Sequence, residues 1–324
     1  MRAAIKKLGP GLLFAASAVG VSHLVQSTRA GAEFGLSMAA LILIACCVKY
    51  PAFRFGAEYA AATGESVIAG YARQGRWLLI FFLLAIAAEG LVVIPAVSLV
   101  TAGLTMNLLG LATNEVLVTM LIVIACSLAL AIGRYRLLEG LAKLFVLVFA
   151  VLCLVAAAAS LPLLGESGAI AAPIAASRAN LDFAVAVAGW MPVGMGGAVF
   201  ISLWVLARPR ATKRADAVAD ARFDFNLGYA ATVVLALAFL VMGTALLFGR
   251  DRTLAASSAG FAAELIDLFS TAVGSWIRPI IGIAALAVMF STVLAVIDGF
   301  PRVYANVTRR LLGSARRQRW LAWW

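Results

Sequence analysis

Three side chains that can bind metal ions or carry protons lie inside long apolar stretches of the sequence: His23, Glu89 and Met191. His23 is the single histidine of the chain, and an imidazole can ligate a metal ion or change its charge near neutral pH. The thioether of Met191 prefers soft metal ions, whereas the carboxylate of Glu89 can balance a cation or carry a proton. Because an ionisable group is costly to bury in an apolar segment, such residues are candidates for a substrate, metal or proton site.

Each of these residues also has a purely structural interpretation, which the sequence leaves open. A lone histidine or methionine can be a packing residue of the core. Glu89 can form a salt bridge with Arg29 or Lys49, which lie within or at the edge of other apolar stretches. Lys49 can in turn extend its long side chain toward a polar boundary. The choice depends on the elements that position these side chains.

Two of the apolar stretches, residues 9–33 and 182–207, are interrupted by glycine and proline. A proline in a helix interior costs roughly 3 kcal/mol or more, and inside a membrane such a break is tolerated where the backbone is buried in protein or lines a wet cavity. We therefore expect two broken helices with a binding cavity between them, as in inverted-repeat transporters; two independent packing kinks are the alternative. The expected helix-break residues are Gly20, Val21, Pro192 and Gly194, and the expected substrate-binding residues are Gly20, Ser22, His23 and Met191.

The composition predicts that these elements are membrane-spanning helices. The 324 residues are 64% hydrophobic and 13% charged, with a mean hydropathy of +1.03, which excludes a soluble domain. The apolar stretches are long enough to cross a bilayer and do not alternate as barrel strands do. We expect a single all-α transmembrane domain, residues 1–324, with about eight transmembrane helices. They are predicted at 9–33, 36–60, 78–106, 115–133 and 137–161 (helices 1 to 5) and at 182–207, 224–248 and 277–299 (helices 6 to 8).

The distribution of basic residues predicts the orientation. The chain has 26 lysines and arginines against 15 acidic residues, and most of the basic residues outside the predicted helices fall in the loops on the side of the N-terminus. This bias places the N-terminus in the cytoplasm, and we expect the protein in the inner (plasma) membrane of a bacterium. The aromatic residues at 320–324 have the composition of the start of a ninth helix, so we expect the sequence to be a fragment that lacks the helices from the ninth onward.

Several short motifs of the chain match those of a known family. They are Gly9-Pro10-Gly11 to Ala30-Gly31-Ala32 in the first predicted helix, Arg54-Phe55-Gly56 and Thr63-Gly64 near the end of the second, Glu89 in the third and Met191-Pro192 in the sixth. With these motifs the sequence resembles the Nramp family of divalent-metal transporters, in which the third helix carries an acidic motif and the sixth carries Met-Pro-His. The resemblance implies a LeuT-like inverted-repeat helical bundle of the APC superfamily, with eleven or twelve helices in the complete fold, and proton-coupled uptake of manganese or iron.

The sequence also departs from the family pattern at most of the metal ligands. The family motif Asp-Pro-Gly-Asn falls on residues 20–23, so the aspartate is lost and His23 stands in place of the asparagine. Met191 matches the family's methionine ligand, but Val193 replaces the histidine after Met-Pro, and Val92 matches the second third-helix acid. The resemblance therefore implies a softer site, with His23 and Met191 as the metal ligands, suited to copper, zinc or nickel or to a cargo that is not a metal.

Several functions remain open on the sequence. The first is a secondary transporter of a divalent metal cation, with weak proton coupling in which Glu89 and His23 are the candidate proton carriers. The second is a transporter of a small organic solute, and the third is a transport-inactive truncated homologue. We expect no enzyme activity, because the sequence contains no recognisable catalytic motif. The expected partners are the lipid bilayer, a metal ion or small solute and protons, with no cofactor and no nucleic acid; the oligomeric state is left open.

Overall fold

The structure is a computed structural model, and it describes residues 9–132, 135–165, 170–174, 177–207, 214–250, 254–255 and 257–312. The predicted start of a ninth helix at 320–324 lies outside the described residues. The basic residues at 2–7 and 316–319, which contributed to the predicted orientation, lie outside them as well.

The first apolar stretch forms a helix that is broken near its middle, as the sequence predicted. Helix α2 (Pro10–Ala18) ends before Val19 and Gly20, and the chain continues as the π-helix η1 (Ser22–Ser27) and as α3 (Thr28–Phe34). The two halves of this helix are bent by 48° at the break. Since π-helices are rare and occur frequently at functional sites, this break is a candidate position for a site.

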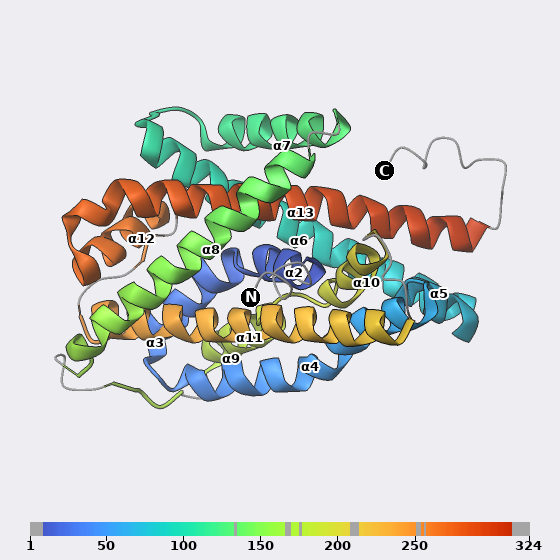
Figure 1. Ribbon diagram of the computed structural model, residues 1–324. Coiled ribbons are helices and arrows are strands. Elements are labelled where there is room, and N and C mark those ends of the chain that lie inside the picture. The colour runs from blue at the N-terminus through green and yellow to red at the C-terminus, as the bar shows by residue number, and fades with distance from the viewer. Residues whose placement is uncertain are drawn as a thin grey trace.

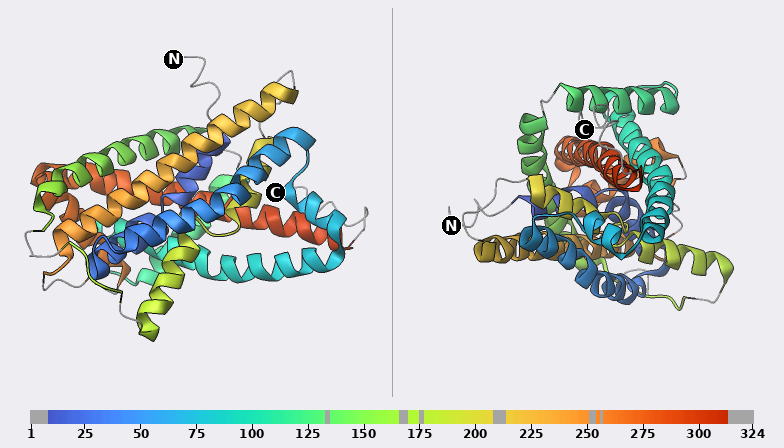
Figure 2. Two further views of the ribbon diagram at one scale, coloured as in Figure 1. Left: turned by 90° about the horizontal axis from the view of Figure 1, so that it is seen from below. Right: turned by 90° about the vertical axis from the view of Figure 1, so that its right-hand side faces the viewer.

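The second predicted break also forms. Helix α9 (Arg178–Trp190) ends at the Met191–Pro192 peptide bond, which is cis, and α10 (Gly197–Ala207) begins after a segment without helical structure. Pro192 has no N–H to donate to the carbonyl group of Ala188, so the helix cannot continue through it. Helix α9 projects from the side of the bundle in both views of Figure 2.

The remaining apolar stretches form helices without such interruptions. Helix α4 ends at Thr63 and is followed by Gly64 in the left-handed conformation (φ 74°), three residues beyond the predicted stretch 36–60 and at the position that the family resemblance implied. The helices are α4 (Met38–Thr63), α5 (Val67–Gln74), α6 (Arg76–Leu109), α7 (Glu115–Ala131), α8 (Tyr135–Ser160), η2 (Leu161–Leu163), α11 (Arg214–Leu247), α12 (Ser258–Val273), η3 (Ser275–Ile277) and α13 (Arg278–Leu312).

The helices confirm an integral membrane protein, but they do not establish the predicted count of eight spans. Among the described residues, four helices are long and apolar enough to cross a membrane, or up to five if the bent pair of α2 with η1 and α3 is one span. Helices α7 and α10 and the segment Leu147–Leu163 are apolar but shorter. The eight-span count therefore stays a prediction.

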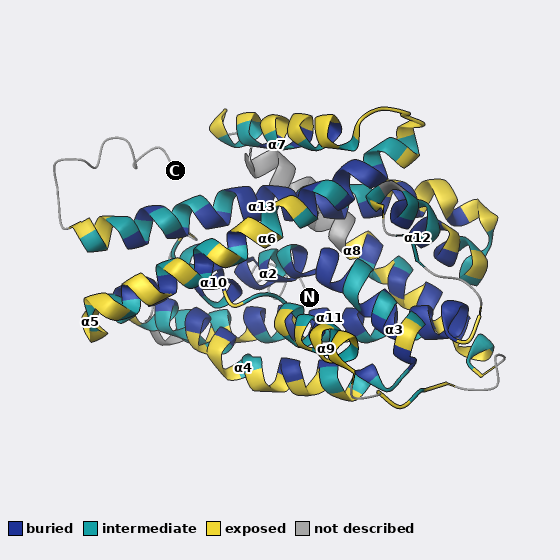
Figure 3. Cartoon of the chain, turned by 180° about the vertical axis from the view of Figure 1, so that it is seen from behind, coloured by how far each residue is buried: buried dark blue, intermediate teal, exposed yellow. Residues whose placement is uncertain are grey.

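Helices α11 and α13 lie at the centre of the bundle, on either side of the first broken helix (Figure 1). In the most apolar 18-residue stretch of each of these two helices, 67% of the residues are buried, against 28% in α4 and 22% in α6. Figure 3 shows many exposed residues along α4 and α7. The outer helices thus face the surroundings of the protein, while α11 and α13 hold the broken helix in place.

Helix α11 packs against both halves of the first broken helix with almost no space between the backbones. A Cβ atom on Gly228 would lie 2.1 Å from the carbonyl oxygen of Gly11, and one on Gly243 would lie 2.2 Å from that of Thr28. Gly31 likewise has the backbone of α11 within 2.2 Å of an ideal Cβ position. Only glycine allows these two close crossings, because any larger residue would force the helices apart.

The N-terminus of α2 is capped by a buried carboxylate from α11. Asp224 is 2% exposed, and its two oxygens accept hydrogen bonds from the N–H groups of Gly9 (3.0 Å) and Gly11 (2.7 Å). Pro10 between them has no N–H group. The first amides of a helix lack intrahelical partners and carry a positive partial charge, so Asp224 satisfies and neutralises this helix end and fixes the start of the broken helix.

Candidate functional site

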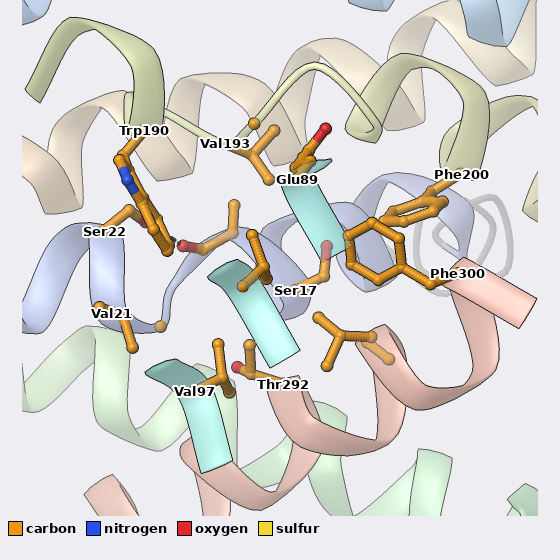
Figure 4. Close-up of a pocket in the computed structure, with 16 residues that line it drawn as sticks. Ser17, Val21, Ser22, Glu89, Val97, Trp190, Val193, Phe200, Thr292 and Phe300 are labelled. Atoms are coloured by element: carbon orange, nitrogen blue, oxygen red, sulfur yellow. Dashed lines mark hydrogen bonds between the residues drawn. The ribbon is translucent and has the colours of Figure 1, made fainter. Parts of the chain in front are cut away.

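A cavity of about 40 Å³ lies where the two helix breaks meet (Figure 4). Its wall is formed by the first break, the segment between α9 and α10, and helices α6 and α13. The polar lining consists of the carboxyl group of Glu89 and the hydroxyl groups of Ser17, Ser22 and Thr292. Most of the other lining is apolar and includes Val97, Trp190, Phe200 and Phe300.

Glu89 projects from α6 toward the segment between α9 and α10 (Figure 4). Its Oε2 atom accepts a hydrogen bond of 2.9 Å from the N–H group of Gly196. A Cβ atom on Gly194 would lie 2.1 Å from Oε1, so the carboxyl group fills the space that a side chain would need. Because Gly196 directly precedes α10, the positive end of that helix favours the carboxylate here. Glu89, the predicted coupling residue, thus lies in the cavity wall.

Ser22 and Thr292 connect the elements around the cavity. The Oγ atom of Ser22 lies 2.7 Å from the carbonyl oxygen of Ala18 and 3.5 Å from that of Pro192, so it reaches from the first break to the second. Thr292 of α13 packs against the first break, because a Cβ atom on Gly20 would lie 2.9 Å from its Cγ2 atom. Gly20 therefore brings α13 close to the break.

His23 is completely buried but does not line the cavity. Its Nε2 atom lies 2.9 Å from the carbonyl oxygen of Thr232 in α11, and its Nδ1 atom lies 2.8 Å from Oγ of Ser22. A carbonyl oxygen only accepts hydrogen bonds, so this network assigns a proton to Nε2. The nitrogen that could then bind a metal ion, Nδ1, is already occupied by a hydrogen bond with Ser22. In this conformation His23 therefore positions Ser22, which does line the cavity.

Met191 is also completely buried and does not line the cavity. Its Sδ atom lies 3.7 Å from Oγ of Ser27 in η1, so the thioether packs between the two breaks. The structure thus brings some of the predicted site residues to the cavity and not others. Of the residues predicted to bind substrate or to break the helices, Gly20, Val21, Ser22 and Gly194 line the cavity, Pro192 reaches it through its carbonyl contact with Ser22, and His23 and Met191 lie beside it.

Lys49, which the sequence suggested would extend toward a polar boundary, instead reaches the second break. Its Nζ atom donates hydrogen bonds to the carbonyl oxygens of Ala188 (2.7 Å), Gly189 (2.6 Å) and Met191 (2.9 Å), with Val193 at 3.4 Å. The sequence signal that could have found this role was a lysine near the middle of a long apolar helix.

The arrangement can hold a cation but does not form a closed metal centre. Within the described part of the chain, no group of three or more His, Cys, Asp or Glu side chains could hold a metal ion. The polar lining offers one carboxylate and three hydroxyls, which are hard oxygen ligands. Such a set suits weak, reversible binding of a hard cation.

The fold is similar to that of a known membrane transporter. A histidine-to-alanine variant of the manganese transporter from Eremococcus coleocola superposes with a TM-score of 0.64 at 17% identity, over 94% of this chain and 68% of that one. The same transporter in complex with an aromatic bis-isothiourea substituted compound gives a TM-score of 0.62 at 17% identity, over 96% of this chain and 65% of that one. The chain thus spans about two thirds of the transporter's length, and at this identity the likeness shows the fold alone.

The chain also has a relative at the level of sequence. It is 35% identical over 312 residues to the uncharacterised protein PM0681 of Pasteurella multocida, a match that covers 95% of this chain and 71% of that protein. The chain belongs to the same family as PM0681. No family model matches the sequence.

Proposed function

We propose that the protein is a secondary membrane transporter of the Nramp type that moves a divalent metal cation through the cavity between its two broken helices. The observation that carries this proposal is the small cavity at the meeting point of both breaks, with the carboxylate of Glu89 in its wall. Inverted-repeat transporters bind their cargo at such paired breaks, and the similarity of the fold to that of a manganese transporter also supports the proposal.

The chemistry of the cavity lining favours a cation over an organic cargo. Its polar side chains offer one carboxyl group and three hydroxyl groups, and none of the residues that the structure describes in its wall is basic, so an amino acid would find no partner for its own carboxylate. The cavity, of about 40 Å³, has room for such an ion. Transport of a small organic solute is therefore the second candidate, and a transport-inactive homologue is the third.

Two ligand sets make opposite predictions about the metal. The oxygens of Glu89, Ser17 and Ser22, as the structure places them, favour a hard cation such as manganese or magnesium. The set implied by the sequence, His23 with Met191, favours copper, zinc or nickel, and it requires the imidazole to release Ser22 in another conformation of the transport cycle. The metal selectivity of uptake discriminates between the two sets.

The test is metal uptake into proteoliposomes, with a panel of manganese, magnesium, zinc, copper and nickel. If the oxygen set binds the cargo, Glu89→Gln lowers uptake of hard cations at least tenfold, while the double variant His23→Gln, Met191→Leu keeps most of it. If the soft set binds the cargo, the double variant loses uptake of soft metals instead. Asp267→Asn, an exposed residue of α12 that pairs with Arg278, is the matched control and keeps wild-type uptake.

Absence of uptake of every metal by well-folded wild type would overturn the metal proposal and leave the organic solute or the inactive homologue. Proton coupling is tested in the same vesicles with an imposed pH gradient. We expect the gradient to raise uptake in the wild type and to have no effect in Glu89→Gln. A gradient-driven flux that persists in this variant would contradict the coupling role of Glu89.

A further inference from the structure

The ammonium group of Lys49 is held by backbone carbonyl groups in the way that a bound cation would be. An ammonium group has three N–H donors, and three carbonyl oxygens lie 2.6 to 2.9 Å from Nζ, those of Ala188, Gly189 and Met191. A fourth carbonyl oxygen, of Val193, lies at 3.4 Å. All four belong to the last turn of α9 and the segment that follows it, so the donors are matched to a single stretch of backbone.

These carbonyl groups are available because the helix is broken. The amide four residues after Ala188 would be that of Pro192, which has no N–H, and the amide four residues after Gly189 is that of Val193, which lies in the non-helical segment. Where such a backbone lies in the apolar part of a membrane, no water replaces the missing donors. The C-terminal carbonyls of a helix also carry a negative partial charge. The end of α9 therefore needs a cation or several N–H donors, and Lys49 supplies both.

The other helix end at this break, the start of α10, is paired with a side chain of the opposite charge. Glu89 of α6 accepts a hydrogen bond from Gly196 at the start of α10, where the helix dipole is positive. The two helix ends of the break are thus each neutralised by a side chain from another helix, Lys49 from α4 and Glu89 from α6. Because the end of α9 and the start of α10 each have a charged partner from the protein, neither helix end requires an ion from solution to neutralise it.

We propose that the carbonyl oxygens of Ala188, Gly189 and Met191 form a monovalent-cation site of the primary-ammonium class, and that its resident cation is the side chain of Lys49. Because this cation is tethered, it cannot leave with the cargo, and the break keeps its structure without a co-transported monovalent ion. A free primary ammonium ion takes the same position when the lysine side chain is removed. This inference goes beyond the proposed transport, since it concerns a second site beside the cavity and is measured without flux.

Chemical rescue of Lys49→Ala tests the proposal. The full chain in detergent is heated in choline chloride, ethylammonium chloride or propylammonium chloride at equal concentration. In choline chloride, a bulky ion without N–H groups, we expect the variant to unfold about 5–10 °C below the wild type, because several carbonyl groups lose their donors. We expect ethylammonium and propylammonium to recover at least half of this loss, and the wild type to show no specific response.

Two control variants make the rescue interpretable. Lys49→Met keeps a side chain of similar length without charge, so we expect a similar loss and no rescue, because the methionine occupies the path of the added ion. Arg302→Met removes a cation that pairs with Asp298 on α13, far along the chain from the break, and we expect no rescue there either. Equal recovery in choline, or equal stabilisation of Arg302→Met, would show a general salt effect and overturn the proposal.

A measurement on the wild type covers the case in which the variants do not fold. Reductive methylation followed by mass spectrometry reports whether the amine of Lys49 is free to react. We expect Lys49 to stay unmodified in the folded protein and to be methylated after unfolding in SDS; rapid methylation in the folded state would overturn the proposal. Rescue without any metal uptake would support this site and remove the proposed transport, whereas metal uptake without rescue would do the reverse.

Discussion

At the scale of single residues, the candidate site depends on the glycines that make room for the carboxyl group of Glu89. Gly194 and Gly196 lie on either side of Met195 in the segment before α10, and both would bring a Cβ atom into contact with this carboxyl group. The carboxyl group can therefore lie against the backbone and accept the N–H of Gly196. A side chain at Gly194 would overlap the carboxyl group, whereas one at Gly196 would first overlap the side chain of Ile86.

Gly194→Ala is expected to displace Glu89 and to lower the free energy of unfolding by about 1–3 kcal/mol, because its Cβ atom would overlap Oε1. The measurement is thermal unfolding in detergent together with metal uptake, and both should fall. Gly189→Ala is the matched control: nothing lies within 4 Å of its Cβ position, and alanine is the better helix former by up to about 1 kcal/mol. Loss of stability in the control but not in Gly194→Ala would contradict this account of the segment.

The sequence identified some of the site residues but not the directions of their side chains. Gly20, Ser22 and Glu89 were predicted and lie in the cavity wall. His23 and Met191 were predicted for the same reason and lie beside it. After the break the chain continues as a π-helix, whose i→i+5 hydrogen bonds give a wider turn than the α-helical period assumes. No local residue preference predicts this change of period, and it places the imidazole toward Thr232 of α11.

At the scale of the elements, the two broken helices were the feature best predicted from the sequence. Glycine and proline cost a helix enough free energy that Gly20 marked the first break, and Pro192 with Gly194 marked the second. What satisfies the freed backbone groups was not predictable in the same way. The partners Asp224, Lys49 and Glu89 come from helices far along the chain, so only the tertiary packing reveals them.

Asp224→Ala tests the capping of the first broken helix. Two buried amides, of Gly9 and Gly11, would lose a charged acceptor, and we expect the free energy of unfolding to fall by about 2–4 kcal/mol. Thermal unfolding measures the change. Asp267→Ala removes a carboxylate from an ion pair with Arg278 in which both side chains are 52% exposed, and such surface pairs contribute only about 0–1 kcal/mol. Equal effects of the two substitutions would argue against a specific role of Asp224.

At the scale of the whole molecule, the composition predicted an integral membrane protein but left the number of membrane spans open. Helices formed at every predicted apolar stretch, yet four or five of them, among the residues that are described, are long and apolar enough to cross a membrane. The shorter helices, such as α7 and α10, are apolar but too short to be assigned as spans from their length. Their placement depends on the lipid and on neighbouring helices.

The predicted orientation is tested across α6, which is one of the four long apolar helices. Gln74 and Thr113 are exposed and lie just beyond its two ends. In a variant without the native cysteines, we expect Thr113→Cys to react with a membrane-impermeant maleimide added outside intact cells, and Gln74→Cys to react only after the membrane is opened. The reverse pattern would invert the orientation given by the basic loops, and labelling of both from outside would exclude α6 as a span.

The glycine crossings between α11 and the first broken helix limit which parts of the molecule can move. Gly11 meets Gly228 near one end of the broken helix, and Thr28 meets Gly243 beyond the break. Backbone contacts on both halves oppose sliding of the broken helix along α11, because any shift would bring the two backbones into overlap. We therefore expect these two elements to move together, and an opening of the cavity toward either side of the membrane to come from displacement of the α9–α10 segment or of α13.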